Sequence, residues 1–268
     1  MNKNLFLKEL QRNKKNLMIW SGIVIGLTLM VLAIFPSMAD MGEDMAQLMA
    51  KMPAELSKAM GMDENTWSSI LGFYSTYYGI YIIVLVSIYT TSTGATILSK
   101  EEKDRTSEFL MTKPISRLAI FKSKMASLLI LSLLIYGIQT ISAIIGMSLF
   151  SSESVDWSIF TVMHASGLVL VLFFTTIGVL ISMFVKPKKN FMGIVVGLTF
   201  GSYFINAIAK STESTEWVGY FSPFHYLDFT ISDPDYSFNF LSAIVMLAIG
   251  AGLLFFAYKT YLKKDIDG

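Results

Sequence analysis

Hydrophobic residues in this chain fall into six long runs that are separated by shorter polar segments. A helix that crosses the hydrocarbon core of a bilayer, about 30 Å thick, needs about 20 mostly apolar residues. No segment alternates between apolar and polar residues as barrel strands do, so helices are the expected spanning form. The pattern predicts an all-α membrane protein with one transmembrane domain over residues 1–268. Its six spans are expected at residues 17–35, 71–98, 118–150, 161–185, 191–209 and 238–258.

Composition supports the membrane assignment. Of the 268 residues, 53% are hydrophobic and 15% are charged, against about 25% charged in an ordinary soluble domain. The mean hydropathy is +0.56. The net charge of +1 gives no reason to expect nucleic-acid binding, and the absence of cysteine excludes disulfides, thiolate metal sites and cysteine nucleophiles. The first run has 19 residues, whereas the apolar part of a signal peptide has about 7–15, so an uncleaved first span is expected.

The basic residues predict the orientation of the chain in the membrane. Of the 21 lysines and arginines, 18 lie in the N-terminal segment, the second and fourth connections and the C-terminus, and three lie in the other connections. Loops rich in lysine and arginine stay on the cytoplasmic side. Both termini are therefore expected in the cytoplasm, as an even number of spans requires.

The predicted spans carry no ionised side chain near mid-membrane, where such residues usually mark ion paths or proton relays. Three lysines fall near span ends, and we expect them to snorkel to the interface: Lys122, Lys124 and Lys259. His164 and His225 are expected toward the outer face, without a nucleophile–base arrangement at membrane depth. The chain also lacks the Gly-x-x-x-x-Gly-Lys-Ser/Thr phosphate loop. A secondary transporter and an intramembrane enzyme are both disfavoured, and a partner would have to supply any energy.

The connection at residues 99–117 is dense in charges of both signs and lies between two predicted spans. Ser99 and Glu102 fit a capping box that would start a short helix. Pro114 would end that helix, and Ser116 would cap the next span. An apolar tip at 109–111 follows the charged flank, which suits docking into a groove on a soluble partner. The alternative is a solvated turn whose apolar edge faces lipid.

This segment resembles the coupling-helix region of type-2 ABC exporter permeases. The sequence E-E-K-D-R-T-S-E-F-L at 101–110, followed by K-P-I-S-R at 113–117 and by Lys124, is similar to the family's pattern E-E-x-x-G-T-x-E-x-L-L-x-x-P-x-S-R with a later lysine. Arg105 stands where the family often has glycine. Further similarities are an N-terminal interfacial helix at 1–16, an outer segment at 52–61 and the element at 222–228 before the last span.

The resemblance implies a pair of permeases bound to two cytosolic ABC ATPase subunits in a prokaryotic plasma membrane. ATP and Mg would bind to the ATPase subunits, this chain would hold no cofactor or metal, and it would not itself be an enzyme. The second permease would be another copy or a paralogue, and lipid would surround the pair. The expected partner-docking residues are Glu101, Glu102, Arg105, Thr106, Glu108, Phe109, Leu110, Pro114 and Arg117.

Two other features leave alternatives open. Glycines spaced for close helix approach would contact either a second permease or another span of the same chain: Gly22, Gly26, Gly193, Gly197 and Gly201. The outer connection is rich in methionine, and its repeat at 38–52 predicts an amphipathic helix for packing or substrate contact, with Cu(I) binding as the alternative.

The leading functional hypothesis is the permease subunit of an ABC exporter for an amphipathic or hydrophobic substrate, such as a peptide, lipid or drug. The neutral, aromatic surface of the spans favours such substrates. The alternative is a membrane component that does not transport: an anchor, or a subunit that transmits force from an ATPase to another assembly.

Overall fold

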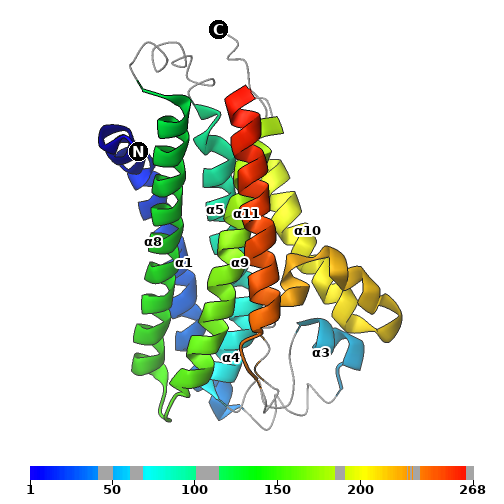
Figure 1. The fold of residues 1–268 in the computed structure, drawn as a ribbon. Coiled ribbons are helices and arrows are strands. Elements are labelled where there is room, and N and C mark those ends of the chain that lie inside the picture. Colours follow the sequence, from blue (N-terminus) through cyan, green and yellow to red (C-terminus); the bar gives the residue numbers. More distant parts are fainter. Residues whose placement is uncertain are drawn as a thin grey trace.

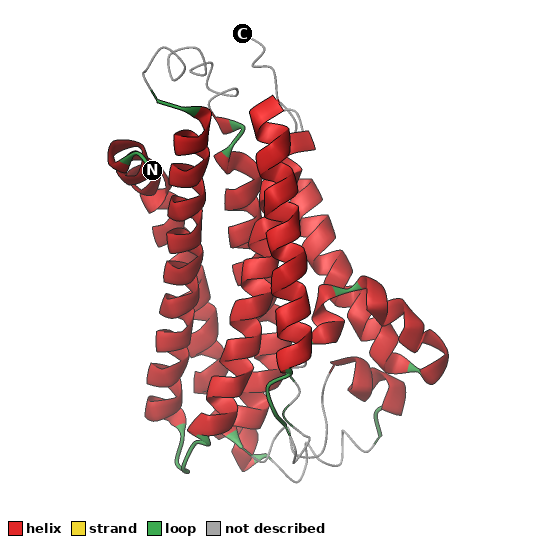
Figure 2. Ribbon diagram, in the orientation of Figure 1, coloured by secondary structure: helices red, strands yellow, loops and turns green. Residues whose placement is uncertain are grey.

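The computed structural model describes residues 1–41, 51–60, 69–100, 115–184, 191–227, 229, 231 and 236–263. Within these residues every regular element is helical (Figure 2), and six helices are long and apolar enough to cross a membrane. The predicted all-α class with six spans is confirmed. The spans are α1 (Lys3–Asp40), α4 (Ile70–Tyr77) with the π-helix η1 (Tyr78–Ile82) and α5 (Ile83–Ile97), α8 (Arg117–Phe150), α9 (Trp157–Phe184), α10 (Phe191–Ser211) and α11 (Phe240–Lys263).

Three short helices lie outside these spans: α3 (Ala54–Met60) and the 3₁₀ helices η2 (Glu213–Phe221) and η3 (Pro223–Tyr226). Serine side chains cap two of the spans. Ser69 accepts a hydrogen bond from the Gly72 amide, at 3.0 Å, and Ser116 accepts one from the Ala119 amide, at 3.2 Å. These caps satisfy amide groups that have no partner inside a helix. The predicted capping of the third span by Ser116 is confirmed.

Helix α1 is continuous from Lys3 to Asp40, so one helix includes both the predicted interfacial segment and the predicted first span. No glycine or proline interrupts the stretch between them, and Pro36 lies in the last turns, where fewer hydrogen bonds are lost. Because α1 ends at Asp40, the methionine repeat at 38–52 does not form one helix. Met38 belongs to α1 and Met41 follows its end, whereas residues 42–50 lie outside the described part.

The second and fourth spans form the centre of the bundle, with α1 and α8 on one side and α10 and α11 on the other (Figure 1). Burial follows this order: in the most apolar stretch of 18 residues, 72% of the residues are buried in the span Ile70–Ile97 and 56% in α9, against 22% in α10 and in α11. Helices α5 and α9 approach closely at two glycines. A Cβ added to Gly178 would lie 2.3 Å from the Thr91 carbonyl oxygen, and one added to Gly94 would lie 2.9 Å from that of Thr175.

The start of α1 and the end of α11 lie at one end of the bundle, where α5 ends and α8 begins (Figure 1). We refer to this as the termini end. This arrangement is what an even number of spans produces. The assignment of that side to the cytoplasm remains a prediction from the charge bias.

Candidate functional site

The predicted docking segment divides between the described and undescribed parts of the chain. Residues 101–114 lie outside the described part, and with them eight of the predicted docking residues: Glu101, Glu102, Arg105, Thr106, Glu108, Phe109, Leu110 and Pro114. The helices on both sides are described. The candidate site can therefore be built from its base, which is formed by the end of α5, the start of α8 and the start of α1.

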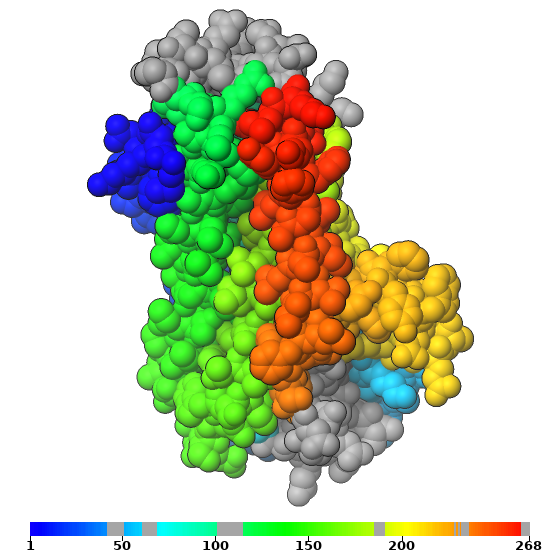
Figure 3. All heavy atoms as spheres, viewed as in Figure 1, coloured from blue at the N-terminus to red at the C-terminus, as the bar shows by residue number. Residues whose placement is uncertain are grey.

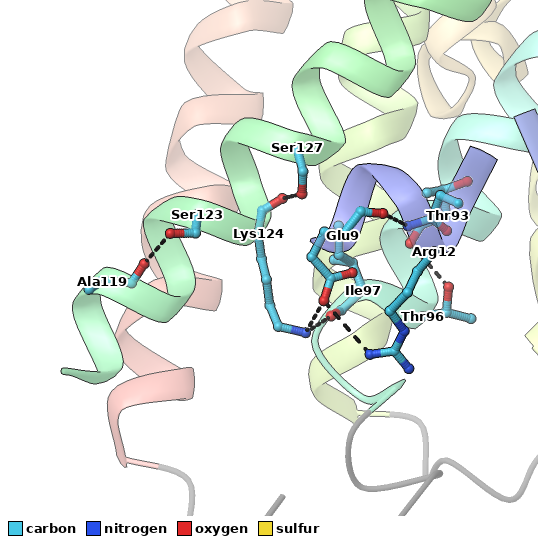
Figure 4. Close-up of polar contacts among 10 residues, drawn as sticks. Glu9, Arg12, Thr93, Thr96, Ile97, Ala119, Ser123, Lys124 and Ser127 are labelled. Carbon is cyan, nitrogen blue, oxygen red and sulfur yellow. Dashed lines mark hydrogen bonds and ion pairs between the residues drawn. The ribbon is translucent and has the colours of Figure 1, made fainter. Parts of the chain in front are cut away.

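A buried ion pair forms the centre of this base. The Nζ atom of Lys124 lies 3.6 Å from Oε1 of Glu9, and the two side chains are 1% and 0% exposed (Figure 4). Glu9 comes from the second turn of α1, and Lys124 from the start of the third turn of α8. Burying either charge alone would be costly, because the protein interior replaces water poorly as a solvent for ions. The pair therefore fixes α1 against α8.

The ammonium group of Lys124 also contacts α5. Lys124 Nζ donates a hydrogen bond of 2.5 Å to the backbone carbonyl of Ile97, the last residue of α5 (Figure 4). Carbonyl groups in the last turn of a helix have no partner within it and carry partial negative charge, so they favour a cation. One side chain thus joins the helices that precede and follow residues 101–114 to each other and to α1.

The burial of Lys124 corrects the prediction that this lysine snorkels to the interface. Lys122 and Lys259 are exposed, as expected of snorkelling side chains, whereas Lys124 turns inward. Its partners are Glu9 and the Ile97 carbonyl, which lie far from it in the sequence. The carboxylate of Glu9 and the helix-end carbonyl of Ile97 compensate for the desolvation of the buried lysine, which would otherwise favour an outward position.

Weaker contacts surround the buried pair. Arg12 Nη1 lies 3.9 Å from Glu9 Oε1, and its side chain is 26% exposed, so this contact contributes less than the buried one. The amide of Asn2 donates a hydrogen bond of 2.8 Å to Ser123 Oγ, which ties the first turn of α1 to α8 a second time. The base is thus an ion pair reinforced at its edges by hydrogen bonds.

Arg117 is the one predicted docking residue that the structure describes. Its guanidinium Nη1 donates a hydrogen bond of 3.1 Å to the carbonyl of Leu262, near the end of α11. This contact joins the first residue of α8 to the last span. The start of α8 is therefore held by α1, α5 and α11 together, so the segment at 101–114 is attached to a base that involves four helices.

Glu9 was not among the functional residues predicted from the sequence. The signal available was that Glu9 is the only acidic residue among five basic ones in the first 16 positions. An isolated carboxylate in a basic segment near a membrane is either solvated or paired. The sequence alone does not name the partner, because Lys124 is one of many lysines.

A second buried polar cluster lies in the opposite half of the bundle. Gln139 Nε2 donates to Tyr74 Oη at 2.6 Å, and Tyr74 Oη lies 3.3 Å from His164 Nε2. His164 Nδ1 lies 3.1 Å from the Phe160 carbonyl and donates to it in the tautomer that leaves Nε2 free to accept from Tyr74. Tyr136 Oη donates to the His164 carbonyl. These hydrogen bonds occupy the histidine within the fold rather than leaving it as a catalytic base.

No metal centre was found among the described residues. Within this part of the chain, no group of three or more His, Cys, Asp or Glu side chains is arranged to hold a metal ion. What the base can do is mechanical: it can keep several helix ends in one position relative to the segment between them.

The predicted packing glycines make no close contact within the described part of the chain. A Cβ added to any of them would meet no described atom within 4 Å, which holds for Gly22, Gly26, Gly193, Gly197 and Gly201. Tight contacts involve glycines that sequence analysis did not single out, such as Gly94 and Gly178. The two glycine series therefore leave small-residue faces on α1 and α10 open in the single chain.

A comparison with known protein families shows which family the chain belongs to. The sequence matches the family described as ABC-2 family transporter protein over residues 3–266. A search among curated proteins finds no match. The family match includes the whole of every described helix, and it confirms the resemblance to ABC-2-type permeases.

Proposed function

This chain belongs to the ABC-2 family of transporter proteins, and we propose that, as the permease subunit of an ABC transporter, it exports an amphipathic or hydrophobic substrate using ATP hydrolysed on separate subunits. The family match over residues 3–266 carries this proposal. Members of such a family are membrane transport components, so catalysis belongs to a partner. The chain is a multi-pass membrane protein, and we place it in a prokaryotic plasma membrane with its termini end in the cytoplasm.

Two observations support docking of an ATPase at residues 101–114. The segment combines charges of both signs with an apolar tip, which is a combination suited to a groove on a soluble protein. Its two flanking helices are joined by the Lys124 contact to Ile97. A force applied to a loop on a rigid base moves the helices, whereas a force applied to a loose loop is lost in the loop. Two ATPase subunits with their ATP and Mg would serve a pair of permeases.

The substrate class follows from the surfaces that the spans offer. The described charged pair of Glu9 and Lys124 lies at the termini end, and polar groups farther along the spans are neutral, as in the cluster around His164. Aromatic and aliphatic side chains make up most of the rest. A charged hydrophilic solute would find few partners on such a surface, which favours a peptide, lipid or lipophilic drug.

Docking can be tested by purifying the tagged chain and measuring ATPase activity in the eluate. We expect wild type to retain an ATPase and the double variant Glu108→Lys/Phe109→Ala to lose it, because the variant reverses one charge and removes the apolar tip. Arg12→Ala provides a control, since it alters a charge at the base outside the docking segment. Equal ATPase retention by all three proteins would contradict docking at this segment. If no ATPase accompanies wild type, the membrane-anchor alternative gains support.

The open glycine faces support pairing with a second permease, which is another copy or a paralogue. Small residues let helix backbones approach closely in a membrane, and no described atom of the same chain uses this space. On this proposal α1 and α10 contribute to the contact between the two permeases.

The absence of cysteine from the chain makes this pairing testable. We expect the single variants Gly26→Cys and Gly197→Cys to form disulfide-linked dimers in membranes under mild oxidation, since a disulfide requires Cα atoms within about 7 Å. Ile141→Cys, at an exposed position on α8, serves as the control and should stay monomeric. Cross-linking at Ile141 but at neither glycine would place the contact on another face.

A further inference from the structure

Helices α8, α9 and α11 enclose an apolar groove that the proposed function does not use. Its volume is about 370 Å³. Helix α9 forms the floor, and the walls come from α8 and α11, as Figure 3 shows on the face where α8 (green) and α11 (orange to red) stand side by side. Representative lining residues are Met125, Leu129, Phe173, Thr176, Met246 and Ala251.

The groove exists because α8 and α11 meet at the termini end. There the ring of Phe121 lies 5.3 Å from that of Tyr258 and 5.7 Å from that of Tyr261. The hydrogen bond from Arg117 to the Leu262 carbonyl closes the same end. Farther along the bundle both helices rest on α9, with Gly250 against Thr176. The groove is therefore closed by aromatic rings near the termini end and lies beside the lipid below them.

Water is a poor occupant of this groove. The lining is aliphatic and aromatic apart from the hydroxyl groups of Thr175 and Thr176. Each hydroxyl donates a 2.7 Å hydrogen bond within α9, to the carbonyls of Val171 and Phe173 respectively. A buried water molecule needs about two to four polar partners. A hydrocarbon chain needs no polar partners, and in a membrane hydrocarbon surrounds the groove.

The volume of the groove and the positive charge of Lys122 indicate which kind of lipid would occupy it. The volume of the groove lies in the lower part of the range for small-molecule sites, about 300–1,000 Å³, which suits a single hydrocarbon chain. Lys122 is exposed and lies three and four residues before Met125 and Ala126, so it shares their face of α8. Lys122 is about one helical turn nearer the termini end than these two residues, which is the side from which a lipid headgroup of that leaflet would approach.

We propose that this groove holds one acyl chain of an anionic phospholipid from the leaflet at the termini end, with the lipid phosphate bound by Lys122. The chain fills the space between α8 and α11 and completes their packing. The proposal rests on the membrane spans and on the groove, and it is independent of which substrate the transporter moves.

The test uses the full-length chain in nanodiscs that contain equal amounts of phosphatidylcholine and a phosphatidylglycerol whose acyl chain carries a diazirine. After illumination, mass spectrometry locates the labelled peptides. We expect labelling concentrated on peptides containing Met125 and Met246, at several times the level found at lipid-facing Leu241. Labelling spread evenly over lipid-facing residues would overturn the proposal. Unlabelled groove peptides beside a labelled outer surface would mean that a protein segment covers the groove, which also overturns it.

Two variants separate the acyl chain from the headgroup. Ala251→Trp fills the groove and should remove the concentrated label, whereas Ala248→Trp, on an exposed position of the same helix outside the groove, should leave it. Lys122→Gln should keep labelling at the groove. The preference for phosphatidylglycerol is measured by repeating the experiment with the diazirine on phosphatidylcholine and comparing groove labelling by the two lipids. We expect this preference to be smaller in Lys122→Gln than in wild type. The wild-type labelling pattern decides the question even if Ala251→Trp folds poorly.

Discussion

Replacing Gly178 with alanine is expected to abolish or strongly reduce the yield of folded protein. The added Cβ would lie 2.3 Å from the Thr91 carbonyl oxygen and 2.9 Å from its Cα atom. Both are backbone atoms of α5, so no side-chain rotation can relieve the overlap. Helices α5 and α9 would have to separate, at a cost of about 3 kcal/mol or more, the upper end of the usual range for overpacking. Thermal unfolding in detergent, followed by size-exclusion chromatography, measures this loss.

The control for this variant is Gly137→Ala. A Cβ at Gly137 on α8 would meet no described atom within 4 Å, and alanine favours a helix over glycine by up to about 1 kcal/mol. Gly137→Ala should therefore leave the melting temperature unchanged or raise it slightly. The same substitution is then expected to have opposite effects at two glycines in the same bundle. Equal melting temperatures for Gly178→Ala and wild type would show that α5 and α9 do not approach this closely.

Lys124→Met is expected to destabilise the protein by about 3–5 kcal/mol, the usual cost of breaking a buried ion pair. The substitution leaves the Glu9 carboxylate, which is 0% exposed, without its closest cation, and it leaves the Ile97 carbonyl without the Lys124 donor. Arg12 lies farther from the carboxylate and is partly exposed, so it compensates poorly. The loss should be visible in the melting temperature and in the fraction of monodisperse protein.

Two further variants identify the cause of this effect. In detergent without added phospholipid, Lys122→Met removes the same charge two residues earlier from an exposed position and should change stability by no more than about 0.5 kcal/mol. Glu9→Gln/Lys124→Met should recover most of the stability lost in Lys124→Met, since it removes both buried charges. If Lys122→Met and Lys124→Met were equally stable, the lysine would be solvated rather than paired.

The same base also bears on transport. If α1, α5 and α8 move together because Lys124 joins them, a change at Lys124 should impair substrate export without impairing ATPase docking. A Lys124 variant that still folds at low temperature should retain the ATPase in copurification and lose coupling between ATP hydrolysis and export. Retention of the ATPase follows because residues 101–114 are unchanged in that variant.

Much of the fold was predictable because lipid imposes strict requirements. Each span must satisfy its own backbone hydrogen bonds, so a long apolar run has no alternative to a helix. The run at 118–150, for example, lies within α8, and Ser116 caps it as predicted. The continuity of α1 was not predictable in the same way. Its sequence changes from amphipathic to apolar where the expected surroundings change from the membrane interface to the bilayer core, but the helix itself continues.

The candidate site was predictable only in part. The segment proposed for docking could be located because its charges stand out between apolar runs. The inward turn of Lys124 could not be anticipated, because a lysine near a span end normally snorkels. Its partner Glu9 precedes the first predicted span and lies far from Lys124 in the sequence. Only folding brings the two side chains together.

The sequence by itself determined the all-α class, the six spans, the common side of both termini and the family, since these follow from local hydropathy, an even number of spans and motif order. The tertiary structure alone decided which glycines carry close contacts, which lysine is buried and where a groove remains. These properties depend on distances between residues far apart in the chain, such as Gly178 and Thr91. Local hydropathy predicts that a helix forms, whereas the shape of its neighbours determines which of its faces becomes buried.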